Sequence, residues 1–310
     1  MKNISIAIHG GAGTILKEYM TPDKEEAYKS ALQNALDKGY QLLKNGGSAV
    51  DAVAKSVSEL EDNPLFNAGK GSVFTAEGTH EMDASIMDGK TLHAGAVSAI
   101  SGVKNPVLLS ELVMNKSEHV FLTGKGAEEF AREMKCEFCD TEYFYDKFRY
   151  QQWQELKGSD QFKLDHSTKN EQKFGTVGAV ALDKFGNIAA ATSTGGMTNK
   201  KFGRVGDSPM IGAGNYANNA TCAVSCTGSG EFFIRAVVAY DVSCLMEYKR
   251  MSLTDACREV VQRRLPKIGG DGGLIAIDSK GNIALEFNTK GMYRGRRNSH
   301  GINEVAIYSS

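Results

Sequence analysis

The chain has 310 residues, of which 41% are hydrophobic and 24% are charged. This is the composition of an ordinary globular protein, and it argues against a disordered tail, a collagen-like repeat and a membrane-spanning protein. Because 36 basic side chains balance 37 acidic ones, the chain lacks the basic excess typical of proteins dedicated to nucleic acid.

Strand and helix signals alternate over the first 64 residues. A buried strand is predicted at 4–8, where isoleucines alternate and glycines end the run. A helix is predicted from the Thr21 cap to Gly46-Gly47. A second helix begins at Ser48, where Ser48 and Asp51 form a capping-box pattern, and it ends near Pro64.

The next segment predicts antiparallel pairing. Two β-type runs within 81–100 are joined by Asp88-Gly89, a dipeptide typical of hairpin turns. Asn105-Pro106 precedes a third helix, a short strand follows at 120–123, and another helix is expected at 126–134.

Composition changes between about residue 140 and residue 175. The segment is polar and charged, and from Lys157 onward only Phe162 and Leu164 are large and apolar. Such a segment buries too little surface to offset the entropy of ordering it. We therefore predict a mobile linker over about 140–175.

The segments after this linker are poor in charge. A hairpin is predicted at 177–191, an inner strand at 222–226, helices at 232–240 and 254–265, and a last hairpin at 274–287. Because hairpins precede helices in both halves, we expect two packed, mainly antiparallel sheets covered by helices on the outside.

The first glycine cluster does not match a nucleotide-binding motif. Gly11-Ala-Gly13 lacks the third glycine of G-x-G-x-x-G, and no P-loop sequence occurs. His9, which precedes the cluster, is a candidate catalytic base, although a lone histidine at the end of a buried strand is more often structural.

Six cysteines are scattered along the chain, and no secretory signal is visible, so reduced thiols in a cytoplasm are expected. Cys136 and Cys139 have C-x-x-C spacing, but no second pair of zinc ligands is evident. Two incidental thiols are therefore the better interpretation.

Thr176 begins the charge-poor hairpin directly after the predicted linker. If the Gly175–Thr176 bond were cut, Thr176 would carry a hydroxyl nucleophile and a free α-amine. An α-amine with a pKa of ~7.7–8.0 accepts the hydroxyl proton near neutral pH without a histidine. From these residues alone, a threonine that simply favours strand formation stays the simpler alternative.

Short motifs that occur in order in both halves carry a family resemblance. They are Ile8-His-Gly-Gly-Ala-Gly13, Asn67-Ala-Gly-Lys-Gly71, Glu81-Met-Asp-Ala-Ser-Ile-Met-Asp-Gly89, Gly175-Thr-Val-Gly-Ala-Val180, Ala191-Thr-Ser-Thr-Gly-Gly196, Gly203-Arg-Val-Gly-Asp-Ser-Pro209 and Thr227-Gly-Ser-Gly230. Together they are similar to those of plant-type L-asparaginases, also called isoaspartyl peptidases, and they resemble the bacterial isoaspartyl peptidase branch more than the glycosylasparaginases. These proteins are N-terminal-nucleophile hydrolases.

The resemblance implies an αββα sandwich made by one self-cleaving chain. Scission between Gly175 and Thr176 would leave an α subunit of residues 1–175 and a β subunit of residues 176–310, which together form one domain. The mature assembly implied is an (αβ)₂ dimer. The activity implied is hydrolysis of β-aspartyl dipeptides and of the side-chain amide of L-asparagine through a covalent β-aspartyl-threonine.

The resemblance also implies roles for catalytic residues. Thr176 would be the nucleophile, and Thr194 would be the second threonine that hydrogen-bonds it. Thr227 and the backbone N–H of Gly228 would form the oxyanion hole, where donors stabilise developing negative charge.

Substrate anchors are implied in the same way. Arg204 would hold the α-carboxylate and Asp207 the α-ammonium of the aspartyl group, because a guanidinium fork and a carboxylate match those opposite charges. Gly228 and Gly230 would add backbone contacts, and Asn67 would line the site.

No cofactor is implied for the chemistry, but a structural sodium ion is. Its ligands would be mainly backbone carbonyls in the loop 60–70, a donor set that suits a hard cation: Leu60, Glu61, Asn63, Phe66, Ala68 and Lys70. Two alternatives stay open, namely a glycosylasparaginase-type hydrolase and an unprocessed protein that binds small amino acids without turnover.

Overall fold

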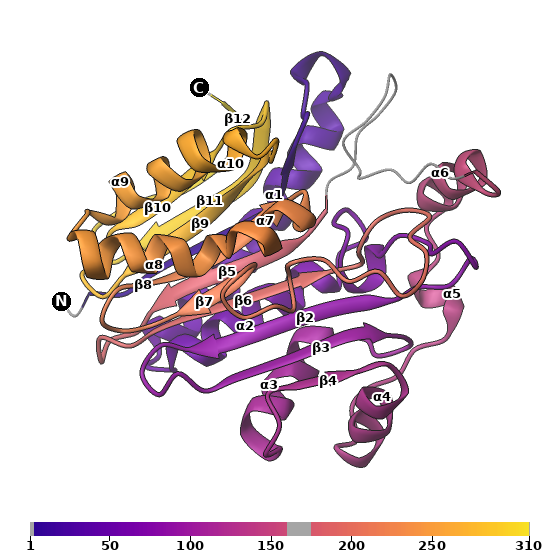
Figure 1. Cartoon of the computed structure of the whole chain (residues 1–310), viewed down its shortest axis with the longest axis horizontal. Coiled ribbons are helices and arrows are strands. Elements are labelled where there is room, and N and C mark those ends of the chain that lie inside the picture. Colours follow the sequence, from indigo (N-terminus) through magenta and orange to yellow (C-terminus); the bar gives the residue numbers. More distant parts are fainter. Residues whose placement is uncertain (1–2, 160–174, 310) are drawn as a thin grey trace.

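The computed structural model describes residues 3–159 and 175–309. In this part of the chain two β-sheets lie face to face between outer layers of helices (Figure 1). Neighbouring strands pair antiparallel throughout, except for one parallel pair at an edge of the larger sheet. The predicted αββα sandwich of mainly antiparallel sheets is confirmed.

The larger sheet has eight strands. In spatial order they are β12 (Asn303–Tyr308), β11 (Gly291–Asn298), β1 (Ser5–Gly13), β5 (Val177–Leu182), β6 (Ile188–Thr194), β2 (Met82–Asp88), β3 (Ala94–Ile100) and β4 (Phe121–Thr123). The smaller sheet contains β10 (Ile283–Phe287), β9 (Gly272–Asp278), β8 (Cys222–Gly228) and β7 (Asn215–Ala217). The first strand after residue 175 therefore lies at the centre of the larger sheet, between β1 and β6.

Helices cover the outer face of each sheet. On the larger sheet these are α1 (Pro22–Lys44), α2 (Ala49–Glu61), α3 (Pro106–Lys116) and α4 (Gly124–Glu133); on the smaller sheet they are α7 (Gly230–Ala236), α8 (Val238–Lys249), α9 (Leu253–Arg258), the π-helical turn η3 (Glu259–Arg264) and α10 (Leu265–Lys267). Short 3₁₀ turns are η1 (Lys17–Tyr19) and η2 (Gly69–Gly71). No helix among the described residues is long and apolar enough to cross a membrane.

Local signals set the helix starts as predicted. The Thr21 side chain accepts a hydrogen bond from the Lys24 backbone N–H at the start of α1. Ser48 and Asp51 form a reciprocal capping box at the start of α2. Each cap satisfies backbone N–H groups that the first helical turn leaves unpaired.

The predicted linker is wrong over part of its length. Residues 140–159 contain two helices, α5 (Thr141–Phe144) and α6 (Lys147–Leu156). Phe144 and Trp153 are buried, and the Trp153 ring stacks on Phe74 with 5.7 Å between centroids. Aromatic side chains within a polar segment thus bury enough surface to order it. The rest of that prediction falls on residues 160–174, which lie outside the described residues.

Two further predictions about the second half need correction. The helix expected at 232–240 is two helices, because Val237 between α7 and α8 adopts a left-handed conformation with φ 49°. The hairpin at 274–287 is not the last, since β11 and β12 follow it and extend the larger sheet.

Candidate active site

One small pocket brings together residues that are far apart in the sequence. Its lining includes every residue predicted for catalysis, substrate binding and cleavage, namely Asn67, Gly175, Thr176, Thr194, Arg204, Asp207, Thr227, Gly228 and Gly230. The free volume is about 20 Å³, which holds about one water molecule. The pocket is therefore narrow, and Gly175 and Thr176 both belong to its lining.

The alternation of strand residues explains why hydroxyl groups gather there. In β5, Val177 and Ala179 pack toward the outer helices, whereas Val180 and Leu182 pack between the sheets. Because side chains alternate between the two faces of a strand, Thr176 belongs to the inner face. The same alternation places Thr192 and Thr194 of β6 and Ser225 and Thr227 of β8 on inner faces, where their hydroxyls meet those of the facing sheet.

The Thr176 hydroxyl lies between two other hydroxyls. Its Oγ1 donates to Thr194 Oγ1 at 3.3 Å and lies 3.5 Å from Ser208 Oγ. Thr194 Oγ1 also accepts a hydrogen bond from the Gly196 backbone N–H at 3.1 Å. This second bond helps to hold the Thr194 oxygen in place next to Thr176. Ser208 belongs to the quoted motif 203–209, but sequence reasoning assigned it no role.

Thr227 and Gly228 end β8 at the opposite wall of the pocket. Thr227 Oγ1 accepts from the Ala12 backbone N–H at 3.2 Å, so the threonine hydroxyl proton is available for a second group. Gly228 has φ 152°, and a Cβ there would lie 2.4 Å from the Asp271 carbonyl oxygen. Only glycine fits this position without displacing the backbone.

The two predicted anchors carry opposite charges and converge beside Gly230. A Cβ on Gly230 would lie 2.8 Å from Asp207 Oδ1 and 3.2 Å from Arg204 Nη2. Asp207 is buried, and burial raises its pKa to about 7 although the nearby Arg204 charge opposes this. Its Oδ2 has no hydrogen-bond partner within the described residues. The Arg204 guanidinium donates through Nε to Glu231 Oε1 at 2.8 Å, a partner that sequence reasoning missed.

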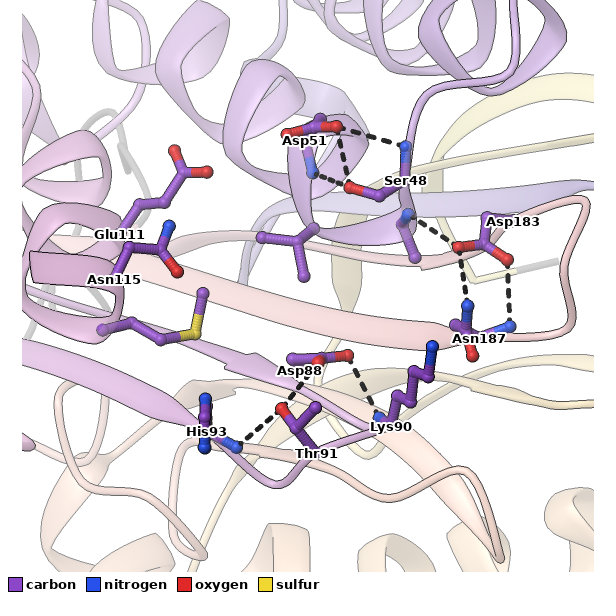
Figure 2. Close-up of a pocket in the computed structure, with 13 residues that line it drawn as sticks. Ser48, Asp51, Asp88, Lys90, Thr91, His93, Glu111, Asn115, Asp183 and Asn187 are labelled. Atoms are coloured by element: carbon purple, nitrogen blue, oxygen red, sulfur yellow. Dashed lines mark hydrogen bonds between the residues drawn. The ribbon is translucent and has the colours of Figure 1, made fainter.

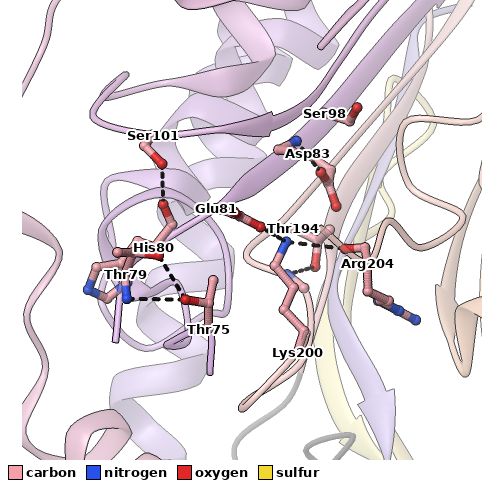
Figure 3. A network of polar contacts seen from close by, with 12 residues as sticks. Thr75, Thr79, His80, Glu81, Asp83, Ser98, Ser101, Thr194, Lys200 and Arg204 are labelled. Atoms are coloured by element: carbon pink, nitrogen blue, oxygen red, sulfur yellow. Dashed lines mark hydrogen bonds and ion pairs between the residues drawn. The ribbon is translucent and has the colours of Figure 1, made fainter. Parts of the chain in front are cut away.

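Two side chains hold the backbone around these groups. Asn67 Nδ2 donates to the Gly196 carbonyl at 2.8 Å, while its Oδ1 accepts from the Val73 N–H at 3.1 Å. Figure 3 shows Lys200 reaching both Glu81 and the backbone of Arg204. Its buried ammonium lies 3.3 Å from Glu81 Oε2 and 3.3 Å from the Arg204 carbonyl oxygen. Lys200 thereby ties the Arg204 segment to the residue that precedes β2.

His9 lies behind the nucleophile rather than in the pocket lining. Its Nδ1 is 3.1 Å from the Thr176 carbonyl oxygen, and its Nε2 is 2.8 Å from Ser225 Oγ. Complete burial lowers the pKa of His9 to about 3. A histidine with so low a pKa is a poor general base near neutral pH. The pKa and the contacts of His9 therefore favour its structural interpretation over the catalytic one.

The loop predicted to bind sodium follows α2. The Glu61 carbonyl oxygen would lie 2.5 Å from a Cβ on Gly69, and the Phe66 carbonyl oxygen 2.0 Å from a Cβ on Gly71. Glycines in η2 therefore let main-chain oxygens lie close to the turn, and oxygen is the ligand type that a hard cation takes. The Lys70 side chain is engaged elsewhere, with its ammonium 5.1 Å from the centre of the Tyr143 ring.

A second, larger pocket of about 380 Å³ lies at the other end of the central strands (Figure 2). It adjoins Asp183, which follows β5, whereas Thr176 precedes that strand. Its carboxylates are mostly used locally; Asp183, for example, accepts from the Ala49 and Asn187 backbone N–H groups. Volume alone would favour this pocket, but the assembled nucleophile, donors and anchors lie in the smaller one.

The cysteines form no cluster of chemical significance in the described parts of the chain. All six are free thiols, and no group of three or more histidine, cysteine, aspartate or glutamate side chains there is arranged to hold a metal. Burial raises the pKa of both Cys136 and Cys139, which makes them less reactive as nucleophiles.

The chain is similar to known proteins over nearly its whole length. A family model described as asparaginase matches residues 2–307. An isoaspartyl peptidase of Salmonella typhimurium is 54% identical over 297 residues, covering 95% of each chain. That of Escherichia coli is 55% identical over 292 residues, covering 93% of this chain and 91% of the relative. An isoaspartyl peptidase/L-asparaginase of Rattus norvegicus is 43% identical over 290 residues, covering 94% and 85% respectively.

Proposed function

The chain belongs to the asparaginase family, and we propose that it is a self-cleaving threonine hydrolase that acts on β-aspartyl dipeptides and on L-asparagine. The observation that carries this proposal is the position of Thr176. Its hydroxyl faces Thr194 in the pocket, and the peptide bond to Gly175 lies in the lining of that same pocket.

Scission comes first in the proposed sequence. The Thr176 hydroxyl oxygen adds to the Gly175 carbonyl carbon, and the peptide nitrogen leaves as an amine that takes the hydroxyl proton, which converts the amide into an ester. Water then cleaves this ester and yields a Gly175 carboxylate and a Thr176 with free hydroxyl and amine. Because Gly175 is part of the lining of the pocket, its departure would open space beside the Thr176 hydroxyl for an aspartyl group.

Hydrolysis of the substrate follows the same chemistry. The Thr176 amine takes the proton of its own hydroxyl, and the oxygen adds to the β-carbonyl carbon of the substrate. The leaving amine takes that proton as the tetrahedral adduct collapses to a β-aspartyl ester. Water then attacks the ester, its proton passes through the amine to the threonine oxygen, and aspartate is released.

The surrounding groups suit this substrate class. The Thr227 hydroxyl and the Gly228 N–H would stabilise the oxyanion, a contribution of roughly 10²–10³ in rate per donor in comparable sites. Arg204 would bind the α-carboxylate and Asp207 the α-ammonium, so the aspartyl group is recognised by both charges. Asp207 Oδ2 supports this assignment, because it has no hydrogen-bond partner among the residues that the structure describes and can accept from the ammonium.

Intact mass and N-terminal sequencing test the proposal. Purified protein should show a fragment that begins at Thr176 and should hydrolyse β-Asp-Leu and asparagine. The Thr176→Ala variant should stay uncut and inactive, whereas Thr221→Val, a buried threonine bonded to Ser243, should behave as wild type. An uncut wild-type chain that binds amino acids without turnover would support the binding-protein alternative. Faster turnover of a glycosylated asparagine than of β-Asp-Leu would support a glycosylasparaginase.

Three accompanying features are part of the proposal. A sodium ion would be held by main-chain oxygens of residues 60–70, supported by the fit of the Glu61 and Phe66 carbonyls around η2. It would order the loop that leads to Asn67 and take no part in the chemistry. An (αβ)₂ assembly and a cytoplasmic location also stay predictions; six free thiols are compatible with the latter.

A further inference from the structure

The carbonyl oxygen of Thr176 is held by a side chain where the sheet pairing ends. The ladder between β1 and β5 runs from Ser5–Leu182 to His9–Gly178. Beyond this last pair, the His9 imidazole contacts the Thr176 carbonyl oxygen at 3.1 Å. The imidazole thus continues the hydrogen bonding of the strand to the residue that carries the reacting hydroxyl.

This contact determines where the protons lie. A carbonyl only accepts hydrogen bonds, so His9 Nδ1 must carry the proton. Since burial keeps the ring neutral, with a pKa of about 3, Nε2 is an acceptor and Ser225 must donate to it at 2.8 Å. The Ser225 oxygen then accepts the single Thr192 hydroxyl proton at 2.7 Å, in preference to the Gly214 carbonyl oxygen, which lies farther from Thr192 Oγ1 at 3.3 Å.

The same network also reaches the hydroxyl group of Thr176. Asn215 Nδ2 donates to Thr192 Oγ1 at 3.3 Å and to the Ser85 carbonyl at 3.1 Å. Ser85 Oγ donates at 2.6 Å to the carbonyl of Ser208, whose own hydroxyl is 3.5 Å from Thr176 Oγ1. The carbonyl and the hydroxyl of Thr176 are therefore both tied to one buried network.

The network requires a residue without a side chain at position 178. A Cβ at this position would lie 2.0 Å from Ser225 Oγ and 2.4 Å from His9 Nε2. Glycine is required here because a methyl group would separate His9, in β1 of the larger sheet, from Ser225, in β8 of the smaller sheet.

We propose that His9 is a positioning residue: its Nδ1–H, backed by Ser225 and Thr192, holds the Thr176 carbonyl and thereby aims the threonine hydroxyl and its freed amine at the substrate carbonyl. This inference rests on the proposed role of Thr176 as nucleophile. His9 touches neither the substrate nor the reacting atoms, so it acts on the rate of the chemical step and leaves substrate anchoring to Arg204 and Asp207.

Three substitutions of His9 separate this role from simple packing. In His9→Asn the amide nitrogen takes approximately the place of Nδ1 and retains the donor to Thr176. His9→Gln reaches toward Ser225 but has no donor at the Nδ1 position, and His9→Leu retains bulk without either contact. The experiment measures kcat and KM for β-Asp-Leu, normalised to the number of free Thr176 termini.

The expected order of kcat is wild type, then Asn, then Gln and Leu. We expect Gln and Leu to lower kcat roughly 10- to 100-fold, the size of effect that a small misplacement of a reacting group produces, with Asn recovering most of the loss. KM should stay within about threefold because the anchors lie on other segments. Ser225→Ala should lower kcat less, and in the double variant it should add little to His9→Asn, since that variant has already lost the link to Ser225.

Two results would overturn the inference. One is a kcat per cleaved site that is unchanged in His9→Leu; the other is a loss of activity that follows thermal stability alone, with Asn no better than Gln. If His9→Leu does not fold, the comparison of Asn with Gln decides. An uncut, inactive wild-type protein would refute the proposed function and this role with it, whereas active wild type with indifferent His9 variants refutes this role only.

Discussion

The guanidinium of Arg204 is paired with the carboxylate of Glu231 before any substrate is present, through Nε and Nη2 at 2.8 Å from Oε1. Glu231 is half exposed, and Arg204 is mostly buried. If Arg204 binds the substrate α-carboxylate as proposed, that carboxylate must share the guanidinium with Glu231 or displace it.

This pairing predicts that Glu231→Gln binds substrate more tightly. Removing the charge frees the guanidinium and removes repulsion of the incoming carboxylate. Because exposed ion pairs contribute about 0.2–1 kcal/mol, KM for β-Asp-Leu should fall about 1.4- to fivefold. Steady-state kinetics measures this. Glu304→Gln, which removes an equally exposed partner of Arg296, is the matched control and should have no effect. A higher KM would mean instead that Glu231 holds Arg204 in its working position.

The raised pKa of Asp207 predicts a steep pH dependence. If Thr176 and Asp207 act as proposed, two groups must lose a proton in the free enzyme: Asp207, with a pKa of about 7, and the freed Thr176 amine, with one of ~7.7–8.0. The slope of log kcat/KM against pH should therefore approach ~2 on the acid side. In the complex the substrate ammonium keeps Asp207 ionised, so log kcat should rise with a slope of ~1. Equal slopes of ~1 would show that Asp207 is ionised throughout.

The same group also affects stability. Its folded-state pKa lies above the unfolded value of ~3.9, so the folded protein binds more protons between about pH 4 and pH 7. Ionisation of Asp207 should therefore lower stability as the pH rises through that window. Asp207→Asn should be inactive. The difference in melting temperature between this variant and the wild type should shift in favour of the variant from pH 5 to pH 7.5. A melting-temperature difference that does not change with pH would contradict the prediction.

Truncation of Trp153 tests the packing of α6. Trp153 is buried against Phe74 and Gly78, so Trp153→Ala should lower the free energy of unfolding by about 3–5 kcal/mol, as for other buried aromatics. Tyr145→Ala, at an exposed ring of the same aromatic cluster, should cost much less. Thermal and urea denaturation measure both, and equal losses would mean that α6 is not anchored by Trp153.

The proposed sodium site predicts an ion-specific gain in stability. At constant ionic strength, replacing tetramethylammonium chloride with sodium chloride should raise the melting temperature, because an ion bound only by the folded state stabilises it. Potassium should act more weakly if the carbonyl cradle suits the smaller ion. An identical melting temperature in all three salts would refute the site.

Much of the site was predictable because its signals are local or lie in contiguous motifs. Thr21 and Ser48 mark helix starts through hydrogen bonds that span three residues. The charge-poor run after Thr176 marks a buried central strand. The quoted motifs carry the family resemblance, which named Thr176, Thr194, Arg204 and Asp207 before the fold placed them around one pocket.

Other partners of these residues became visible only in the tertiary structure. Glu231 meets Arg204 across 27 positions, and His9 meets Thr176 across 167; such contacts depend on strand register and on which sheet faces meet. The ordering of α5 and α6 likewise needed Phe74 and His80, which lie far earlier in the chain. Periodicity and caps are properties of short segments, whereas an ion pair or a buried network forms only when distant segments pack closely together. For this reason the sequence named Thr176 and its partner Thr194, but the contacts of Glu231 with Arg204 and of His9 with Thr176 required the tertiary structure.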